Sequence, residues 1–543
     1  MAGESKGISR RRFVVGTVAG VAVGVAVGAA GGYLGKSAVT STQTTTLPAV
    51  TNTSTQIQTT TVTAQPWLPA SWDHTADVVV VGFGGAGGAA AWEACNAGAS
   101  TIVLEGTSAG GGSTNICGGV VMMGGGTPLQ QALGFSDTTQ NMYNYFMAAG
   151  GFGVDSDLTQ TYCNNSLDLY DWLVNKIGVV FNKSYQDRYP AAANPTYGLY
   201  MSGDEWQHAA SATPVPRGHT TLGIPDSSTH SGSGVFQPLQ TAVVNLGAQI
   251  FYNTLGQSLV VDPDSGRVLG VSAQQNGATL HFKASRGVII TAGGFAFNPD
   301  MLAMYAPEYA SVSPLGTPGD DGSGIKMGQE IGADVRNMGW VFAAGPEGTG
   351  YSPVIPMAMS VLVSQQGLRY MAEDHYLAWS GKAYVEQYNP SYMICDSNVY
   401  ALTSSIGLPS VAKADTVHDL ATALKTPAGV LEDTIALYNQ SAATGADPLY
   451  NKDKRFVVPL TTPPFYALPS YGSSCFTHGG LRINTGAQVL DTSATPIPGL
   501  YAAGRSSASI LAQNYQGSGT SVSSALIFGR IAGKNAAAEK PWS

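Results

Sequence analysis

The clearest hydrophobic pattern in the chain is the unbroken β-branched run Val78 to Val81, which predicts a strand buried on both faces of a parallel sheet. Small residues follow from Gly82 onward and continue into an alanine-rich stretch that predicts a helix. A second short apolar run, Thr101 to Leu104, predicts the next strand, and the acidic residue Glu105 follows it directly. The stretch from Asp77 to Glu105 therefore predicts a strand, a glycine-rich turn, a helix and a second strand.

The glycines of this turn have the spacing of a dinucleotide-binding turn. Gly82, Gly84 and Gly87 match G-x-G-x-x-G, in which the glycines permit a tight turn, an approach of the backbone to a pyrophosphate, and close packing of the helix. The helix N-terminus favours the pyrophosphate, and Glu105 is placed to accept hydrogen bonds from ribose hydroxyls. The glycine match alone is weak in a chain with 68 glycines, but the flanking strands agree with it. We expect a dinucleotide to contact Gly82, Gly84, Gly85, Gly87 and Glu105.

The C-terminal part of the chain carries a related pattern. Ala487 to Leu490 predicts a strand, and Ile497 to Gly504 predicts another strand that ends in Ala-Ala-Gly. This ending, so far from the first glycine turn, is typical of flavin domains made from two chain segments, and it favours FAD. A final helix is predicted from Thr520 to Ala538, and its N-terminus would face the edge of the flavin where reduction deposits negative charge. We therefore expect Gly504, Thr520 and Ser521 to contact FAD.

Composition narrows the class of protein. The length of 543 residues predicts two or three packed units. Charged residues make up 11% of the chain and the net charge is -9, so no basic stripe is available for nucleic acid. The five cysteines are odd in number and widely spaced, which gives no support to a zinc site, an iron–sulfur cluster or a disulfide framework. The sequence therefore predicts no metal site and no nucleic-acid partner.

The N-terminal segment reads as a targeting signal. Residues 9–13 are Ser-Arg-Arg-Arg-Phe, and a weakly hydrophobic, glycine-rich run follows to about Leu34, as in a twin-arginine export signal. A membrane anchor is the alternative, because glycines recur at every fourth position from Gly16 to Gly28. We predict a signal or anchor over residues 1–35, a threonine-rich linker over 36–66 and an extracytoplasmic location, with membrane contact only through the N-terminal segment.

From about Ala76 to Ala538 the chain resembles the flavoproteins that include fumarate reductase flavoprotein subunits and 3-ketosteroid dehydrogenases. Besides the two ends, the resemblance lies in the segments 111–114, 289–295 and 319–324. It implies an α/β fold in which a Rossmann-like FAD-binding domain, residues 67–300 and 460–543, carries an inserted α+β cap domain, residues 301–459. It also implies flavin contacts from Gly112, Ser113, Ala292 and Gly293.

The branch of this family depends on the residues over the flavin. Fumarate reductases hold a dicarboxylate with a histidine two residues before a Thr-x-Gly-Gly motif and with an arginine in the last loop. This chain has Phe476 and Tyr515 at those positions. A phenyl ring and a phenol do not neutralise carboxylates, so a small diacid is a poor substrate.

The last loop instead resembles that of 3-ketosteroid dehydrogenases, in which a tyrosine hydroxyl and a glycine N–H hold the C3 carbonyl. The corresponding residues are Tyr515 and Gly519, with Ser518 as an assisting serine. The cap motif of residues 367–376 places Tyr376 as the base, whose pKa would have to be lowered from about 10. The resemblance implies an enzyme that removes an α-proton from a 3-oxo-steroid or similar cyclic ketone and transfers a β-hydride to flavin N5.

Several points stay open at this stage. The segments 123–130, 198–203 and 216–219 resemble the subgroup that forms the C4–C5 double bond, whereas the loop spacing is partly that of the other steroid branch, so the ring position is undecided. A reductase of unsaturated organic acids with an external electron donor, and a flavin carrier without substrate chemistry, are the alternatives. A dehydrogenase needs an external electron acceptor. We expect His219 to be structural and His478 to lie behind the site, and Arg505 replaces an acid that often binds ribityl hydroxyls.

Overall fold

The computed structural model of the chain describes residues 41–46, 57–62, 68–186, 198–221, 232–345, 355–386, 390–405, 409–470 and 472–542. Contacts divide the chain into two units, Met1–Ala64 and Gln65–Ser543. In the first unit, β1 (Ser41–Thr46) pairs antiparallel with β2 (Ile57–Val62) within the segment predicted to be a linker. The predicted signal, residues 1–35, lies outside the described residues, and the role of the linker stays a prediction. None of the helices in the described part of the chain combines the length and apolar character that crossing a membrane requires.

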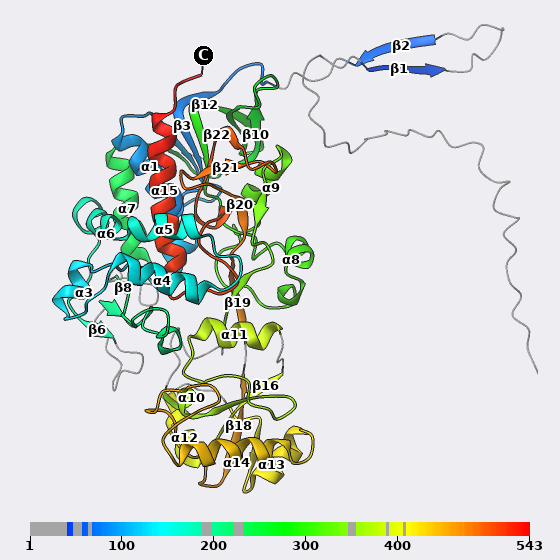
Figure 1. Ribbon diagram of the computed structural model, residues 1–543. Coiled ribbons are helices and arrows are strands. Elements are labelled where there is room, and N and C mark those ends of the chain that lie inside the picture. The colour runs from blue at the N-terminus through cyan, green and yellow to red at the C-terminus, as the bar shows by residue number, and fades with distance from the viewer. Residues whose placement is uncertain are drawn as a thin grey trace, which may run out of the picture. The chain divides into compact units, whose positions relative to one another are not determined.

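The second unit contains an eight-stranded mixed sheet at one of its ends, where both predicted dinucleotide segments meet (Figure 1). Its parallel part runs β22-β12-β3-β4-β9, and β10, β11 and β21 add antiparallel strands. The strands predicted over 78–81 and 101–104 are confirmed, because the β-branched run and the second apolar run are both buried. The strands are β3 (His74–Val81), β4 (Thr101–Leu104), β9 (Gln249–Phe251), β10 (Thr254–Val261), β11 (Val268–Gln275), β12 (Ala278–Ile290), β21 (Gln488–Leu490) and β22 (Pro496–Ala502).

Helices α1 (Gly85–Asn96) and α15 (Thr520–Ala538), the predicted final helix, cover this sheet, and α7 (Ser233–Asn245) packs on α1 (Figure 1). Small residues let α15 approach α1 closely. A Cβ added at Gly529 or Gly533 would lie 2.4 or 2.1 Å from the carbonyl oxygen of Ala86 or Ala90. The C-terminal segment is therefore built into the same core as the first glycine turn, and the α/β fold class is confirmed.

A second hydrophobic core lies at the other end of the unit, between residues 357 and 468. A four-stranded antiparallel sheet is packed there against helices, in the order β15-β16-β18-β17. Met301, Ile325 and Val341 belong to the first core, and the buried residues of the second core begin at Met357. The division into a cofactor domain and a cap stays a proposal. The elements of this core are α10 (Ile355–Met359), β15 (Val361–Ser364), β16 (Ser391–Cys395), α12 (Ser397–Ala401), β17 (Ala412–Ala414), α13 (Val417–Leu424), α14 (Val430–Ala442) and β18 (Phe465–Ser470).

Short elements connect these two ends. A small sheet of order β5-β8-β7-β6 flanks α15, and α11 (Leu377–Glu386) lies against β14 (Val341–Ala344) between the two cores. The bounds of the other connecting elements are α2 (Gly112–Ile116), β5 (Val120–Met122), α3 (Pro128–Ala132), α4 (Thr139–Gly150), α5 (Ser156–Asn164), α6 (Ser166–Asp171), η1 (Trp172–Ile177), β6 (Tyr185–Gln186), β7 (Leu199–Tyr200), η2 (Trp206–His208), β8 (Gly218–Thr220), α8 (Pro299–Tyr305), η3 (Pro307–Tyr309), α9 (Ser323–Glu330), β13 (Val335–Arg336), η4 (Leu402–Ser405), β19 (Ser473–Thr477), β20 (Gly480–Arg482), η5 (Gly504–Ser506) and β23 (Ser507–Ala508).

Candidate active site

A cavity of about 880 Å³ lies at the carboxyl ends of the parallel strands. Ala502, Ile290, Val81 and Leu104 are side by side in register as the last residues of their strands, so the loops that follow them converge. This is where ligands bind in open α/β sheets.

The lining includes every residue that the sequence predicts for the site except two. From the cofactor set these are Gly82, Gly84, Gly85, Glu105, Gly112, Ser113, Ala292, Gly293, Gly504 and Ser521, and from the catalytic set Tyr376, Tyr515, Ser518 and Gly519.

Gly87 and Thr520 are the two predicted residues that do not line the cavity. A Cβ added at Gly87 would lie 2.0 Å from the carbonyl oxygen of Gly82, so this glycine serves the packing of α1 against the turn. Thr520 is fully buried, and its hydroxyl donates to the carbonyl of Gly517 at 2.8 Å. Thr520 therefore stabilises the first turn of α15 on the side that faces away from the cavity.

The turn between β3 and α1 presents backbone to the cavity. Gly82 has a φ of +101°, which favours glycine, and the Phe83 N–H donates to the Glu105 carboxylate at 2.9 Å. Helix α1 has no side-chain cap and no acidic residue in its first turn, and a Cβ at Gly84 would meet only the Gly111 carbonyl oxygen at 3.7 Å. An uncapped helix N-terminus behind an open glycine fits the pyrophosphate of a dinucleotide. Helix α15 also begins at the cavity without a side-chain cap.

The opposite end of the cavity is aromatic. The ring of Tyr515 packs against Phe342 and Phe476, with centroid distances of 4.7 and 5.1 Å, and these two rings contact each other at 4.9 Å; the ring of Tyr376 is 6.2 Å from that of Tyr515. Phe342, Tyr376 and Tyr515 belong to a small buried cluster that is separate from both large cores. Such a surface suits a large apolar ligand with few polar groups.

The hydroxyl of Tyr515 is oriented by backbone donors. The Ser521 N–H, at the start of α15, donates to it at 3.1 Å, and the Gly519 N–H acts on it as well. Burial raises the pKa of Tyr515 above its usual range, and these two N–H groups oppose the rise. Its proton finds no acceptor in the part of the chain that the structure describes. Tyr515 is therefore arranged to donate a hydrogen bond into the cavity. The family resemblance implies that the Gly519 N–H donates to the substrate carbonyl beside Tyr515, whereas here this N–H acts on the Tyr515 hydroxyl.

Tyr376 and Ser518 form a pair of hydroxyls at the same end, with 2.8 Å between their oxygens. Either oxygen can be the donor. The sequence required that the pKa of Tyr376 be lowered, and this expectation is wrong for the structure: burial raises that pKa well above 10, the neighbouring Tyr515 raises it further, and the bond to Ser518 only partly opposes them. Tyr376 is therefore a neutral phenol that is coupled to a serine.

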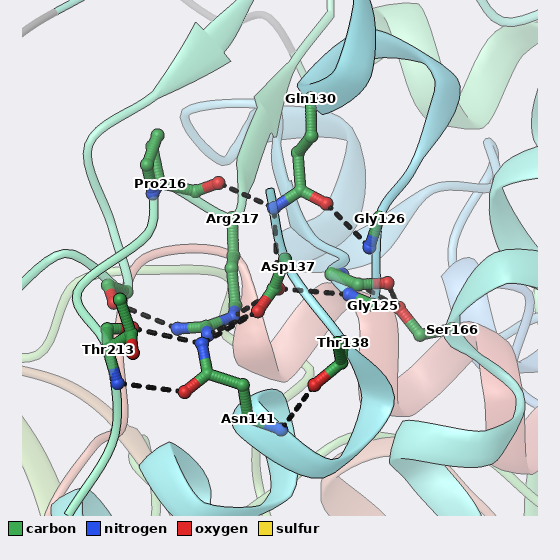
Figure 2. A network of polar contacts seen from close by, with 12 residues as sticks. Gly125, Gly126, Gln130, Asp137, Thr138, Asn141, Ser166, Thr213, Pro216 and Arg217 are labelled. Atoms are coloured by element: carbon green, nitrogen blue, oxygen red, sulfur yellow. Dashed lines mark hydrogen bonds and ion pairs between the residues drawn. The ribbon is translucent and has the colours of Figure 1, made fainter. Parts of the chain in front are cut away.

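A buried ion pair lies behind the loop that carries Tyr515 and Ser518. Arg217 donates through Nε and Nη2 to the two carboxylate oxygens of Asp137, each at 2.8 Å, and both side chains are fully buried (Figure 2). Its Nη1 donates to the Gly203 carbonyl at 2.9 Å. Ser202, which directly precedes Gly203, accepts a hydrogen bond from the Ser518 N–H at 2.6 Å through its hydroxyl oxygen. The bidentate pair thus fixes the segment on which Ser518 rests.

A second buried contact holds the same loop. The hydroxyl of Tyr145, on α4, lies 2.5 Å from the Gln516 carbonyl oxygen and 2.6 Å from Oε2 of Glu205. Glu205 also accepts the Gly203 N–H at 2.9 Å. The single proton of Tyr145 is thus placed between two acceptors, one of which belongs to the substrate loop. Sequence reasoning missed Tyr145 and Glu205, because neither belongs to a motif.

The cap motif that contains Tyr376 is held by buried charges. Arg369 donates to Glu373 at 2.9 and 2.8 Å and to Asp447 at 2.9 and 2.7 Å. Lys452 is 2.8 Å from Glu373, and its ammonium donates to the Ser360 carbonyl. Arg369, within the cap motif of residues 367–376, thus anchors the segment that leads to Tyr376.

The two histidines named from sequence lie outside the cavity lining. His219 is buried between Thr127 and the Arg217 carbonyl, at 2.9 Å from each, which fits the structural role expected of it. His478 contacts the Ala512 carbonyl through Nδ1 at 2.6 Å, and its ring centroid is 6.0 Å from that of Tyr515. Burial lowers the pKa of each histidine to about 4, so both rings are neutral at neutral pH.

Several lining residues gave no individual signal in the sequence. Tyr200 lies within the segment 198–203 that was noted only for its likeness to steroid enzymes, and Phe342 and Leu255 belong to no motif. Among the described residues that line the cavity, Arg505 is the one cationic side chain, and it forms an ion pair with Asp320 at 2.8 Å.

Comparison with known proteins agrees with this geometry. The model of the family described as "FAD binding domain" matches residues 77–522. The chain is similar in structure to a 3-ketosteroid-Δ4-(5α)-dehydrogenase from Rhodococcus jostii RHA1, solved in complex with 4-androstene-3,17-dione. The TM-score is 0.80 and the identity 36%, over 87% of this chain and 98% of the other. In sequence it is 29% identical to urocanate reductase from Eggerthella lenta, over 88% of this chain and 77% of that protein. It is also 25% identical to 4-oxocyclohexanecarboxylate 2-dehydrogenase from Sinomonas cyclohexanicum, over 86% and 93%.

Proposed function

The chain belongs to this FAD-binding flavoprotein family, and from that premise we propose that it dehydrogenates a 3-oxo-steroid or a similarly shaped cyclic ketone. The protein is an FAD-dependent oxidoreductase of the steroid dehydrogenase and fumarate–urocanate reductase group. The observation that carries the proposal is the Tyr515 hydroxyl, which lies at an aromatic end of the cavity with its proton directed to no protein acceptor in the described residues.

The residues around the cavity fit FAD. The open face at Gly84 and the uncapped N-terminus of α1 would hold the pyrophosphate, and Glu105 would accept ribose hydroxyls. The N-terminus of α15 would face the flavin ring, where reduction adds negative charge. When bound, FAD supplies the acceptor for a hydride.

Tyr515 would bind the ketone oxygen of the substrate. Removal of a proton next to a ketone creates negative charge on that oxygen, and a pre-oriented phenol donor stabilises it. One such donor is worth about 2.7 to 4 kcal/mol in comparable oxyanion sites. The N–H groups that act on Tyr515 increase its strength as a donor, because they withdraw electron density from its oxygen.

The Tyr376–Ser518 pair would take the proton. Because burial keeps Tyr376 neutral, neither hydroxyl is available as a stable anion. The proton would move from the substrate carbon to one oxygen of the pair, that oxygen would pass its own proton to the other oxygen, and the second oxygen would release a proton to water, so no net charge builds up on the pair. The Ser202 hydroxyl oxygen accepts a hydrogen bond from the Ser518 backbone N–H, and this bond holds Ser518 in place at the cavity.

The alternative, reduction of an unsaturated organic acid, is favoured by the similarity to urocanate reductase. A carboxylate clamp is the feature that it requires. Arg505, the single cation of the described lining, already binds Asp320, and Phe476 and Tyr515 occupy the positions expected to contact an acid. The charge distribution therefore supports a ketone over an acid.

Anaerobic titration of the holoenzyme with saturated 3-oxo-steroids tests the proposal. We expect the flavin absorbance to bleach, and Tyr515→Phe to abolish bleaching while retaining FAD. Tyr466→Phe is the control, because Tyr466 stacks on Tyr400 in the second core, outside the cavity. Re-oxidation of pre-reduced enzyme by fumarate or urocanate, together with no response to steroids, would favour the reductase.

We also propose that the protein is exported and that an external acceptor re-oxidises its flavin. The proposal of export rests on the residues Ser9 to Phe13 of the sequence, which lie outside the described part. Arg10→Lys combined with Arg11→Lys should retain the protein in the cytoplasm, as cell fractionation would measure. Unchanged export of this double variant would contradict the twin-arginine route.

A further inference from the structure

Arg505 lies in η5 directly after β22 and is held by one edge of its guanidinium group. Its Nη2 donates to both carboxylate oxygens of Asp320, at 2.9 and 2.8 Å. Asp320 also accepts the Gly294 N–H at 3.0 Å and the Ser113 hydroxyl at 2.9 Å. The carboxylate is therefore surrounded by protein donors.

The cation is the member of this pair that reaches the cavity. The Asp320 side chain is 3% exposed, whereas that of Arg505 is 13% exposed, and both residues line the cavity. Nε and Nη1 of Arg505 find no acceptor among the residues that the structure describes. The Asp320 carboxylate is thus covered by the protein, whereas the Arg505 guanidinium group faces the cavity.

Arg505 is located where the two ends of the cavity meet. Its guanidinium carbon is 5.5 Å from the ring centre of Phe476, at the aromatic end, and Gly504 precedes it at the cofactor end. Its charge also acts on Cys117, another residue of the lining: burial raises the pKa of that thiol, and Arg505 is among the groups that oppose the rise. A cofactor that spans the cavity has to pass this cation.

We propose that Arg505 is the charge partner of the reduced flavin and raises the affinity of bound FAD for electrons. FAD that accepts a hydride gains two electrons and one proton, so its ring system can carry one net negative charge that the oxidised form lacks. A fixed guanidinium at the cavity wall stabilises the charged form over the neutral form. The inference concerns the cofactor and does not require that the substrate be a steroid.

Sulfite provides a test without any substrate. It adds to oxidised flavin and leaves the ring system with a negative charge, so its affinity reports the local positive potential. In the full-length holoenzyme, Arg505→Gln should weaken sulfite binding at least tenfold. An equal change in the two-electron equilibrium corresponds to about 30 mV in the flavin reduction potential. Arg505→Lys should keep sulfite binding within about threefold of the wild type, because it retains the charge.

Two further variants make the test independent of any change in folding. Asp320→Asn removes the counter-charge and should strengthen sulfite binding, the opposite direction to Arg505→Gln. Arg482, on β20, forms a more exposed ion pair with Asp334, and Arg482→Gln removes the same charge there and should leave sulfite binding unchanged. The proposal fails if Arg505→Gln and Arg482→Gln, both loaded with FAD, bind sulfite equally well, or if Asp320→Asn weakens binding. Failure of the steroid titration with these sulfite effects intact would overturn the proposed substrate alone.

Discussion

The two ends of the cavity are formed by different parts of the chain, one by backbone turns and the other by side chains. The cofactor end consists of backbone: the turns that follow β3, β4, β12 and β22 present N–H groups and glycines, and an added Cβ at several of them would overlap a carbonyl oxygen. The substrate end consists of side chains from distant segments, chiefly Phe342, Tyr376, Phe476 and Tyr515. We therefore expect the first end to fail by loss of packing and cofactor, and the second to fail by loss of chemistry with the cofactor still bound.

The largest effect is expected at the cofactor end. Gly87→Ala would place a Cβ 2.0 Å from the Gly82 carbonyl oxygen and should give protein without FAD and with a much lower melting temperature. Gly84→Ala is the matched variant, because its Cβ would have 3.7 Å of room to the nearest protein atom. Gly84→Ala should fold normally yet lose FAD affinity, since only the ligand approaches there. Flavin-to-protein absorbance ratios and thermal melts measure both, and full FAD occupancy in Gly87→Ala would contradict the comparison.

The next effect is expected at the substrate end. Tyr376→Phe and Ser518→Ala break the same hydroxyl pair, and each should lower kcat/KM about a hundredfold with FAD retained. The double variant should be little worse than either single one, because each change removes the whole relay. Tyr370→Phe is the control, since Tyr370 forms a comparable pair with Ser391 at 3.2 Å within the second core. Additive losses in the double variant would show that the two hydroxyls act separately.

A smaller effect concerns pH and the buried ring beneath Tyr515. The pKa of His478 is about 4 in the folded chain and near 6.5 when unfolded, so the unfolded state binds the proton first. The stabilisation from the neutral ring is complete above pH 6.5 and is lost as the pH falls toward 4. Between pH 7 and 5 this removes about 2 kcal/mol. His478→Gln should remove this contribution and make the stability curve less steep, while His219, whose pKa is also lowered to about 4, keeps its own contribution.

The smallest effect is expected behind the substrate loop. Tyr145→Phe removes the hydroxyl that contacts the carbonyl of Gln516, whose residue is 1% exposed. We expect kcat to fall about tenfold with KM changed less, because the loop shifts but its reactive groups remain. Tyr143→Phe on the same helix is the control. A loss of stability without any change in kcat would mean that Tyr145 only supports the fold.

The sequence predicted the fold well where local pattern and tertiary role coincide. The run Val78 to Val81 is apolar because both faces of β3 are covered, and the final helix begins at Thr520 as expected. The pattern does not say which core Met301, Ile325 and Val341 join, because apolar residues suit either one. The core is decided by which sheet the segment meets, and that is a tertiary property.

The candidate site shows the same contrast. Glycines and a terminal acid identify the cofactor end because a backbone site needs those residues at fixed spacing. Phe342 and Tyr145 could not be found, since nothing about a lone aromatic residue distinguishes a ligand-facing ring from a packed one. The pKa of Tyr376 was expected to fall because a base needs it, yet burial among Tyr515 and its neighbours raises it. The sequence identifies the side chain, but the residues packed around it in the fold determine its pKa.

The close contact of α15 with α1 also has a consequence for biosynthesis. Gly529 and Gly533 bring the last helix onto Ala86 and Ala90, and β22 completes the parallel sheet beside β12. Residues 496–538 therefore emerge from the ribosome after every other part of the cofactor cavity has been made. A growing chain has one wall of the cavity missing until that moment. Capture of FAD thus has to wait until residues 496–538 have been made, and a ribosome-stalled chain that lacks these residues should carry no flavin.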